Sequence, residues 1–378
     1  MYLLLLFLKP SAATFHYTVY SLSTKLDMPY IASVSKVDLP CRTDQQAVKE
    51  QARIAFTSRS PHMERLMDVF DNTQIITRNF CKPLGYYMAP STFEDRNNQY
   101  LETTLKYSVE AIEECIDRAN INKEDITDIV FISTTGLATP SMDALIINRM
   151  RLDPHINRMP IFGLGCAGGV SGMAKANAIA IANPNAIVLL VAVELCSLTV
   201  LRDDYSTSNF VGSSLFSDGI AACLVMGDNH QGDNRVRYRS ASSKLYYDSL
   251  EVMGWDFTNN GFKVLFSKDI PMFIKENVLN DITGFLSKQG LKLEDIKNFI
   301  FHPGGKKVLE AYRDALDVEG DFLQNSRVVM NNYGNMSSVT VLYVLERFMN
   351  EGFEDGYGLM MAMGPGFSSE MVLLEMVN

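Results

Sequence analysis

Two stretches of the chain carry apolar residues at the spacing of one helix face. These stripes comprise Leu101, Leu105, Ile112 and Ile116, and then Ile274, Val278, Ile282 and Phe285. Residues three and four apart fall on the same side of an α-helix, so each stretch predicts an amphipathic helix with one buried face. Pro271 precedes the second stripe and suits the first turn of its helix, where no intrahelical N–H bond is lost.

Continuous apolar runs predict buried strands elsewhere. They cover residues 186–193, 220–226, 327–330 and 359–374. Asn183-Pro184 should end a small-residue helix, because proline disfavours helical geometry in the residue before it. The last helix is expected to start at Ser337 or Ser338, either of which can cap it, and to end at Gly352.

The two halves of the chain repeat one pattern. Segment 123–131 reads Lys-Glu-Asp-Ile-Thr-Asp-Ile-Val-Phe, segment 293–301 reads Leu-Glu-Asp-Ile-Lys-Asn-Phe-Ile-Phe, and each follows one helical stripe. Strands that alternate with helices predict a parallel or mixed sheet covered on both faces. The pattern therefore favours an α/β fold with a duplicated core, divided into an N-terminal half over 28–230 and a C-terminal half over 231–378.

Residues 1–27 stand apart from both halves. The apolar run 3–8 has no basic segment before it, and it is far too short to cross a bilayer, which takes about 20 residues. A more ordinary beginning is found at Met28. We interpret 1–27 as a poorly fixed extension or a misassigned start, and the alternative is a weak membrane-surface anchor.

Composition narrows the class of protein. The chain has 378 residues, of which 47% are hydrophobic and 21% charged, as is typical of a globular protein with a large core. Its net charge of −10 argues against a general nucleic-acid surface. The six cysteines form no CxxC pair, which favours free thiols in a reducing cytosol. The five histidines form no ligand pair at helical spacing, so no metal site is expected.

Cys166 is the first candidate for chemistry. It lies in the segment Gly-Leu-Gly-Cys-Ala-Gly-Gly over 163–169, between a strand-like run and the small-residue helix. At a helix N-terminus, unpaired N–H groups and the helix dipole lower a cysteine pKa from roughly 8.5 toward about 3.5–7.5. The segment therefore predicts a nucleophilic thiolate, and the alternative is a buried structural cysteine in a tight turn.

Two further polar residues lie at expected strand ends. His302 follows the strand-like run 299–301, and Asn335 lies between the run 327–330 and the last helix. Either residue alone is more simply a turn or cap residue. Together with Cys166 they predict one site, because open α/β sheets gather their sites at the carboxyl ends of strands. A thiolate can hold an acyl group while an imidazole and an amide each donate a hydrogen bond.

Four motifs follow one another along the chain. They are Gly-Cys-Ala-Gly-Gly at 165–169, His-Pro-Gly-Gly at 302–305, Tyr-Gly-Asn-Met-Ser-Ser at 333–338 and Gly-Pro-Gly-Phe at 364–367. This combination resembles the type III polyketide synthases, the chalcone-synthase-like branch of the thiolase-fold condensing enzymes, from about residue 30 to the C-terminus. Segments 253–256 and 266–271 look like the bacterial members. The resemblance implies a thiolase-like duplicated layered core (αβαβα) with two mixed sheets.

The resemblance also implies a reaction. Cys166 would accept a starter acyl group from an acyl-CoA, while His302 and Asn335 hold the thioester oxygen of malonyl-CoA during decarboxylation. The resulting enolate would attack the Cys166 thioester, and the grown chain would cyclise. CoA thioesters are then substrates, and neither a metal nor a cofactor is implied. The loop at Thr139-Pro140 matches one that reaches a partner's cavity, which implies a homodimer. The free thiols favour a cytoplasmic protein, and no integral membrane segment is expected.

Several positions match residues around the substrate. Phe216 resembles a gatekeeper phenylalanine between the CoA tunnel and the cavity, and Val264 takes the other gatekeeper position, which should widen the entrance. The three basic residues of the plant pattern for CoA are reduced to Arg65, with Asp68 and Asn72 in the other places. The phosphates must therefore be held differently. The alternatives are a core aromatic for Phe216 and a solvated helix face for Arg65.

The expected cavity is lined by small side chains. Thr134, Thr135 and Cys196 match cavity-lining positions, and Gly305 matches a substrate-binding one. In bacterial relatives small residues here open the floor to a fatty tail, and each buried CH₂ contributes about 0.8 kcal/mol. We therefore expect a medium- or long-chain starter and an alkylpyrone or alkylresorcinol product. The alternative for Cys196 is a small buried core residue.

Two other functions share these residues. An initiating β-ketoacyl-ACP synthase III uses the same cysteine, histidine and asparagine, although the Pro-Gly-Gly after His302 and the late Gly-Pro-Gly-Phe favour the polyketide branch. The other alternative is a catalytically inactive acyl-CoA-binding protein on the same fold, against which the complete set of three residues argues.

Overall fold

The computed structural model describes residues 28–57, 61–232 and 235–378, so the expectation for residues 1–27 lies outside the described residues. The main sheet has nine strands. From one edge to the other they are β11 (Ile296–Phe301), β12 (Gly356–Gly364), β13 (Ser368–Met376), β8 (Val236–Leu245), β1 (Tyr30–Lys36), β7 (Asp218–Met226), β6 (Ile187–Leu195), β4 (Asp128–Ile132) and β5 (Asn157–Ile161).

Two half-sheets meet at one residue pair. β1 pairs with β7 along its length but with β8 only at Tyr30 and Arg237. β4 is parallel to β5 and β6, and β11 is parallel to β12, whereas β1, β7, β8 and β13 pair antiparallel with their neighbours. The two mixed sheets expected from the sequence are therefore present, joined edge to edge into one.

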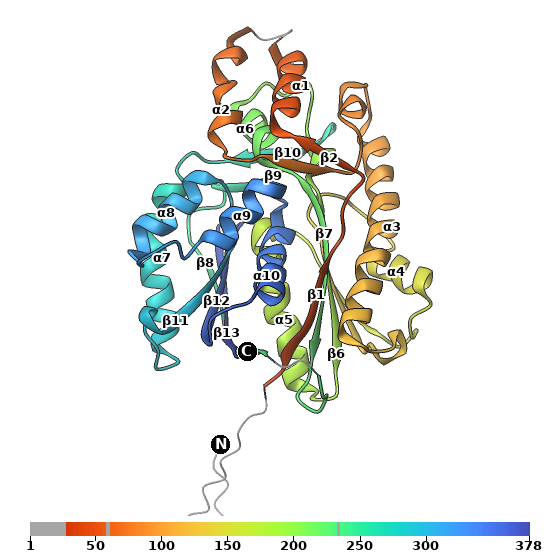
Figure 1. Ribbon diagram of the computed structural model, residues 1–378. Coiled ribbons are helices and arrows are strands. Elements are labelled where there is room, and N and C mark those ends of the chain that lie inside the picture. Colours follow the sequence, from red (N-terminus) through yellow and green to blue (C-terminus); the bar gives the residue numbers. More distant parts are fainter. Residues whose placement is uncertain (1–27, 58–60, 233–234) are drawn as a thin grey trace, which may run out of the picture.

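Helices form three layers around the half-sheets (Figure 1). The middle layer holds α5 (Gly168–Ala182) and α10 (Thr340–Glu351), one outer layer holds α3 (Phe93–Ala119) and α4 (Met142–Met150), and the other holds α7 (Ile270–Ser287) and α8 (Lys306–Leu316). The middle helices contact sheet on both sides, and α5 is correspondingly rich in glycine and alanine. This order confirms the predicted α/β fold with layered αβαβα architecture.

The remaining elements lie mostly above these layers. α1 (Gln45–Thr57), α2 (Asp68–Asn72) and α6 (Thr207–Leu215) lie together at the top of Figure 1 with the two-stranded sheets β2 (Cys41–Asp44)–β3 (Thr77–Phe80) and β9 (Met253–Thr258)–β10 (Gly261–Phe266). α9 (Gln324–Tyr333) precedes α10. The 3₁₀ turns are η1 (Pro61–Leu66), η2 (Leu84–Met88), η3 (Lys123–Asp125), η4 (Gly165–Ala167), η5 (Cys196–Thr199), η6 (Leu293–Asp295) and η7 (Ser337–Val339).

The repeated segments fold alike. Each leaves its amphipathic helix, makes a 3₁₀ turn at η3 or η6 and enters a strand. A carboxylate at the end of each turn accepts a hydrogen bond from the backbone in front of it, Asp125 from the N–H of Asn122 at 3.0 Å and Asp295 from the N–H of Lys292 at 2.7 Å. The shared Glu-Asp-Ile therefore marks the same helix-to-strand connection in both halves.

Most predicted elements are confirmed. Both stripes lie on the buried faces of α3 and α7, and Pro271 stands in the first turn of α7. α5 ends at Ala182 with Asn183 as its C-cap, and Gly352 is the C-cap of α10. The run 359–374 is a hairpin of two buried strands, β12 and β13.

Two local predictions are wrong. Residues 327–330 belong to α9 and not to a strand, because Ser326, Val329 and Met330 form the buried side of a helix that is polar at most of its other positions. The serines do not cap α10, which begins after η7 with Val339 as N-cap. The Ser338 hydroxyl instead donates to Glu194 at 2.7 Å.

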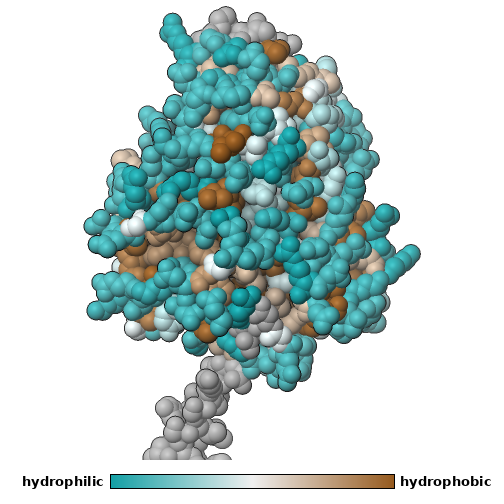
Figure 2. Space-filling view, viewed as in Figure 1, coloured by the Kyte–Doolittle hydropathy of each residue, from teal (hydrophilic) through white to brown (hydrophobic). Residues whose placement is uncertain are grey.

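Hydrophilic residues dominate the face shown in Figure 2, and hydrophobic residues appear there in small separate groups. Among the described residues, no helix combines the length and the apolar character that crossing a membrane requires. The apolar side chains are instead buried against both faces of the main sheet, in the layers between it and the helices.

Candidate active site

Cys166 lies in a tight turn between β5 and α5. Gly165 adopts a φ of +46°, a left-handed conformation that glycine enters without strain. A Cβ at this position would lie 2.7 Å from the ring of Pro365, so the close contact also excludes a side chain. The Gly-Pro-Gly-Phe motif therefore supports the turn that carries the thiol.

His302 stands directly after β11, as expected. Its backbone N–H donates to the carbonyl of Met361 on β12 at 2.8 Å, which continues the strand pairing by one residue. The side chain is 3% exposed, and within the described part of the chain neither ring nitrogen has a hydrogen-bond partner. Buried polar groups are normally paired, so this ring is available to a ligand.

Asn335 does not follow a strand, as the sequence suggested, but follows α9 and Gly334. Backbone hydrogen bonds fix it nevertheless. Its N–H donates to Leu215 at 2.9 Å, and its carbonyl accepts from the N–H of Ser217 at 2.8 Å. These bonds flank Phe216, with which Asn335 forms an isolated bridge. The connection between α6 and β7 therefore positions the amide as the expected strand would have done.

The three side chains line one cavity of about 20 Å³. Its other walls are mostly apolar, formed by Met253, Phe266, Ile270, Ile274, Gly304, Val308, Tyr312, Met363 and Phe367. Such a volume holds about one water molecule. An acyl group can therefore enter only when wall side chains move.

The amide of Asn335 has a fixed orientation. Its Oδ1 accepts from the N–H of Ser337 at 2.8 Å, and its Nδ2 donates to the carbonyl of Gly304 at 3.0 Å. An amide nitrogen has two hydrogens, and the second one is directed at Cys166, whose pKa this hydrogen bond lowers. Because Gly304 and His302 lie in the same short segment, that donor and the imidazole face the same cavity.

The expectation of a lowered cysteine pKa is wrong for this closed cavity. Burial raises the pKa of Cys166 to about 12, and the Glu194 carboxylate adds to the rise, while hydrogen bonds to Ser337 and Asn335 oppose it. Burial lowers the pKa of His302 to about 3. Excluding water penalises both charged forms more than the turn at the helix N-terminus favours a thiolate. Thiol and imidazole are therefore both neutral here.

Glu194, which the sequence analysis did not single out, is a fully buried carboxylate beside the site. Its Oε1 accepts from the hydroxyls of Thr134 and Ser338, both at 2.7 Å. Its Oε2 accepts from the hydroxyl of Thr135 at 2.9 Å and from the N–H of Thr134 at 3.1 Å. Burial raises its pKa. This network ties β4, β6 and the start of α10 together next to Cys166.

Thr134, Thr135 and Cys196, which were expected to line the cavity, lie outside its walls. Thr134 and Thr135 direct their hydroxyls to Glu194, and Cys196 is 2% exposed. None of the three is among the residues that line the cavity of Cys166. Their contact with a substrate stays a prediction. The lining residue Tyr312, which was missed, is 1% exposed on α8, where the sequence shows only an apolar helix face.

The two positions expected to be gatekeepers lie close together. A Cβ at Gly212 would lie 3.2 Å from the ring of Phe216 and 3.7 Å from Val264, so both side chains border this position on α6. Phe216 also makes an edge contact with Phe266, with ring centroids 6.3 Å apart. Because Phe266 lines the cavity of Cys166, this aromatic pair borders the site.

The other two predicted residues lie further out. Gly305 lines a second cavity of about 250 Å³ that shares Phe266, Ile270, Gly304 and Val308 with the cavity of Cys166. Arg65 is exposed on η1 and lines neither cavity.

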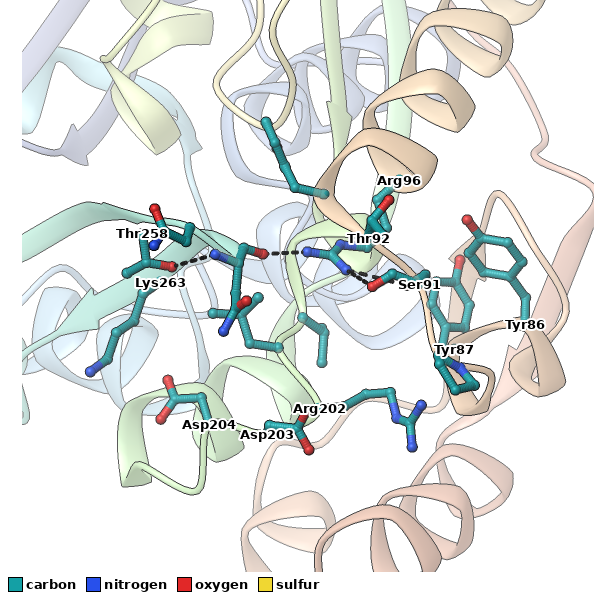
Figure 3. Close-up of a pocket in the computed structure, with 16 residues that line it drawn as sticks. Tyr86, Tyr87, Ser91, Thr92, Arg96, Arg202, Asp203, Asp204, Thr258 and Lys263 are labelled. Carbon is teal, nitrogen blue, oxygen red and sulfur yellow. Dashed lines mark hydrogen bonds between the residues drawn. The ribbon is translucent and has the colours of Figure 1, made fainter.

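A larger cavity of about 650 Å³ lies between the start of α3, the segment after η5 and the hairpin of β9 and β10 (Figure 3). Arg96 crosses it, donating to the carbonyl of Ser91 at 3.0 Å and to the carbonyl of Asn260. Its charged residues have both signs, with Arg202 and Lys263 near Asp203 and Asp204. It contains neither cysteine nor histidine, so it offers no nucleophile of the kind expected.

All six cysteines are free thiols, as predicted. Within the described residues, no three histidine, cysteine, aspartate or glutamate side chains are grouped so that they could hold a metal ion.

Comparisons with known proteins agree on one family. Residues 69–229 match the N-terminal domain, and residues 238–378 the C-terminal domain, of the chalcone and stilbene synthases. A Bacillus subtilis (strain 168) relative whose chalcone synthase name is provisional is 41% identical over 92% of this chain and 99% of its own. The 1,3,6,8-tetrahydroxynaphthalene synthase of Streptomyces peucetius subsp. caesius is 36% identical over 79% of this chain and 80% of its own.

Solved structures agree with the sequence comparisons. The 1,3,6,8-tetrahydroxynaphthalene synthase of Streptomyces coelicolor A3(2), described as a bacterial type III polyketide synthase, superimposes with a TM-score of 0.88. It is 29% identical, and the match covers 92% of this chain and 99% of that one. The polyketide synthase domain of Steely1 from Dictyostelium has a TM-score of 0.86 at 24% identity, which supports the fold.

Proposed function

This chain belongs to the chalcone and stilbene synthases, the type III polyketide synthases, and from that membership we propose that Cys166, His302 and Asn335 form its condensing site. Cys166 carries the acyl chain, and His302 and Asn335 act on malonyl-CoA. One observation carries the proposal. Three polar side chains, distant in the sequence and each tied to a different element, line a single buried cavity whose other walls are mostly apolar.

Loading begins from the neutral pair. The Cys166 sulfur attacks the thioester carbon of an acyl-CoA while its proton passes to the unpartnered imidazole of His302. The bond to the CoA sulfur then breaks, and the leaving thiolate takes that proton from His302. The acyl group remains on Cys166, and the imidazole of His302 is neutral again.

Extension uses the two hydrogen-bond donors. The thioester oxygen of malonyl-CoA accepts from the N–H of His302 and from the second N–H of Asn335. Carbon dioxide leaves, and the electron pair of the broken C–C bond forms an enolate whose oxygen those donors stabilise. A donor of this kind is worth roughly 10²–10³ in rate. The enolate carbon attacks the Cys166 thioester, and the thiolate of Cys166 leaves and takes up a proton from water. Each extension therefore consumes the acyl thioester on Cys166, one malonyl-CoA and one proton.

Intact-mass spectrometry tests this assignment directly. Incubation with an acyl-CoA should add one acyl mass to the protein, and Cys166→Ala should remove that addition. His302→Ala and Asn335→Ala should lower the decarboxylation rate of malonyl-CoA roughly 10²–10³-fold. Cys223→Ala is the matched control, because this buried thiol of β7 does not line the cavity of Cys166 and its loss should leave acylation intact. Acylation that persists in Cys166→Ala, or near-normal decarboxylation in both other variants, would refute the assignment.

We also propose a medium- or long-chain starter and an alkylpyrone or alkylresorcinol product. The apolar walls around Cys166 support this choice. Thr134, Thr135 and Cys196 lie outside those walls, and their place at the cavity floor is part of the proposal. Each CH₂ of a buried tail contributes about 0.8 kcal/mol, so kcat/KM should rise with chain length. Cys196→Phe should shift the optimum to shorter chains, and Cys196→Ser should not. A flat or falling series in the wild type would reject the proposal.

A homodimer is supported by the sheet edge. β5 ends the main sheet, and four of its five residues are exposed. Exposed apolar side chains accompany this edge: Leu137 (42% exposed) in the loop after β4, Met159 (38%) in β5, and Phe162 (49%), whose ring pairs with Phe257 (59%). We name these four residues the edge patch. Such an edge normally requires cover. The loop at Thr139-Pro140 leads into Ser141, whose hydroxyl accepts a hydrogen bond from Arg158 of β5 at 3.0 Å. The free thiols fit a reducing cytosol.

A further inference from the structure

The cavity of about 250 Å³ beside the active site has two unlike walls. One wall consists of α2 and α6 and contributes Val69, Asn72, Thr73, Thr207, Ser208, Val211 and Leu215. The other wall runs from the end of β10 into α7 and from His302 into α8, contributing residues 266–268, 270–271 and 304–308.

This cavity adjoins the active site. Phe266, Ile270, Gly304 and Val308 line both it and the cavity of Cys166. At its other end lie Lys268 and Lys307, which are exposed, and Lys306, whose side chain is 37% exposed. The cavity therefore lies between the walls of the Cys166 cavity and a group of lysines that reach solvent.

Few carboxylates near this cavity could neutralise the three lysines. Among the residues that line this cavity none is acidic. Lys306 has an ion pair with Glu310 at the long distance of 3.9 Å, and the described part of the chain shows no ion pair for Lys268 or Lys307. The carboxylates next to Lys268 and Asn72 in the sequence have other hydrogen-bond partners. Asp269 accepts from the Ser267 hydroxyl, and Asp71 accepts from Lys49.

The start of α8 adds to the positive potential. Gly305 is its N-cap without a side-chain hydrogen bond, and its first turn holds no acidic residue. A helix of eleven residues presents free N–H groups and a partial positive charge at this end. Here that end coincides with Lys306 and Lys307.

The opposite wall lacks comparable charge. Asn72 of α2 lines the cavity and is neutral. The plant pattern has a basic residue at this position. Arg65 is exposed and outside the cavity, and Asp68 carries the opposite sign. The basic residues that line this cavity therefore stand on the wall opposite α2.

We propose that Lys268, Lys306 and Lys307 bind the nucleotide phosphates of CoA thioesters, so that the thioester arm reaches Cys166 through this cavity. The proposal rests on the function given above. Phosphate oxygens accept charge-assisted hydrogen bonds from ammonium groups, and neutral partners on α2 leave the lysine wall as the dominant attraction. The pantetheine arm, which is uncharged, then passes between Phe266 and Gly304.

Two thioesters separate this role from the chemistry. Malonyl-CoA carries the phosphates, and malonyl-N-acetylcysteamine carries the same reacting group without them. The double variant Lys306→Glu/Lys307→Glu and the single variant Lys268→Glu should raise KM for malonyl-CoA about 10- to 100-fold with kcat nearly unchanged. Their kcat/KM for malonyl-N-acetylcysteamine should equal that of the wild type.

Matched charge reversals serve as controls. Lys106→Glu and Lys288→Glu each change the net charge by as much as Lys268→Glu, and neither residue lines the cavity. Both should leave KM for malonyl-CoA within about twofold, because screening weakens distant surface charges. Lys306→Arg/Lys307→Arg should retain wild-type KM. Increasing salt should raise KM for malonyl-CoA in the wild type and less in the double variant.

Direct binding makes the outcomes distinguishable. Free CoA, titrated calorimetrically into wild type and double variant, should bind the variant about 10- to 100-fold more weakly. If wild-type protein decarboxylates neither thioester, the proposed function fails, while this titration still tests the lysines. An unchanged Kd for CoA in the double variant, an equal loss with both thioesters, or a larger effect of Lys106→Glu would overturn the lysine proposal. The lysine proposal would also be overturned if the lysine variants kept the wild-type KM for malonyl-CoA and lost activity only when the malonyl group was supplied on an acyl carrier protein.

Discussion

At the scale of single residues, the site depends on polar groups that burial keeps neutral. Cys166 and His302 share a cavity that holds about one water molecule, and burial raises the pKa of the thiol to about 12 while lowering that of the imidazole to about 3. A charged pair must therefore form inside the closed site by proton transfer between neighbours, where the attraction of opposite charges offsets the loss of hydration. The unpartnered ring of His302 is the natural acceptor.

The neutral His302 predicts a loss of stability in acid. Its pKa in the folded protein lies below the unfolded value of about 6.5, so its contribution is complete above that pH and is lost as the pH falls toward 3. Each pH unit in this window should cost the wild type about 1.4 kcal/mol through this residue. His302→Gln cannot take up the proton, so its Tm should fall less between pH 7 and pH 4.5 than the wild-type Tm.

Exposed histidine provides the control for that comparison. His155 is 92% exposed, so His155→Gln should follow the wild-type Tm across the same range. Equal acid sensitivity of wild type and His302→Gln would mean that His302 is already protonated in the folded protein, and the neutral pair would have to be abandoned.

The sequence predicted the three central residues but not their supports. Each of Cys166, His302 and Asn335 lies in a short motif with glycine or proline, and such motifs can be recognised locally. Glu194 and Tyr312 lie in ordinary strand and helix patterns, and only the packing of distant elements brings them to the site. Thr134 and Thr135 were placed near the right region, but no local pattern shows that their hydroxyls face a carboxylate.

At the scale of elements, the strongly periodic segments were predictable and the short ones were not. α3 and α7 each repeat the helical period over several turns, and a polar face opposes the apolar one. Residues 327–330 are too few to show a period, so two buried apolar residues in α9 resembled a strand. Asn335 nevertheless lines the same cavity as Cys166 and His302, because bonds to Leu215 and Ser217 hold it where a strand end was expected.

Close helix packing yields a prediction about α5. A Cβ at Gly169 would lie 2.2 Å from the carbonyl oxygen of Ser338 and 2.7 Å from Val341, so Gly169→Ala must push α5 away from the start of α10. Overpacking of this kind costs about 1–3 kcal/mol, and chemical denaturation should show that loss. The shift should also lower condensation activity, since Cys166 and Glu194 adjoin the two displaced segments.

Gly284 on α7 is the matched control for that substitution. It lies in a helix interior, is exposed, and a Cβ there would meet no atom within 4 Å. Gly284→Ala should therefore stabilise the protein by roughly 0.5–1 kcal/mol through the better helix propensity of alanine. If both substitutions changed stability alike, the packing of α5 against α10 would not be the cause.

At the scale of the whole molecule, duplication explains the layered fold. Each half supplies an amphipathic outer helix, a 3₁₀ turn, parallel strands and one buried middle helix, and the half-sheets join at a single residue pair. The repeated segments 123–131 and 293–301 made this arrangement predictable. The join between Tyr30 and Arg237 was not predictable, because pairing between the edge strands of two sheets produces no periodic pattern in the sequence of either strand. The division at residues 230 and 231 stays a prediction.

Duplication also leaves the two sheet edges unequal, and this difference predicts how copies associate. The edge strand β11 is largely buried, whereas β5 is exposed and accompanied by the edge patch. Pro160 lacks an N–H, so an added strand would find one donor missing, and side-chain packing must supply most of the association energy. Met159→Glu introduces a charge at the centre of that contact, and burying an unpaired carboxylate is costly.

The association is therefore expected to fail in Met159→Glu and to survive in Met272→Glu. Met272 is 57% exposed on α7, in the other half, and offers the same substitution away from β5. Sedimentation velocity should give twice the chain mass of 42.3 kDa for the wild type and Met272→Glu, and the single mass for Met159→Glu. A dimer that persists in Met159→Glu, or dissociates in Met272→Glu, would place the interface elsewhere. Retention of the fold in a Met159→Glu monomer would further show that one chain contains a complete core.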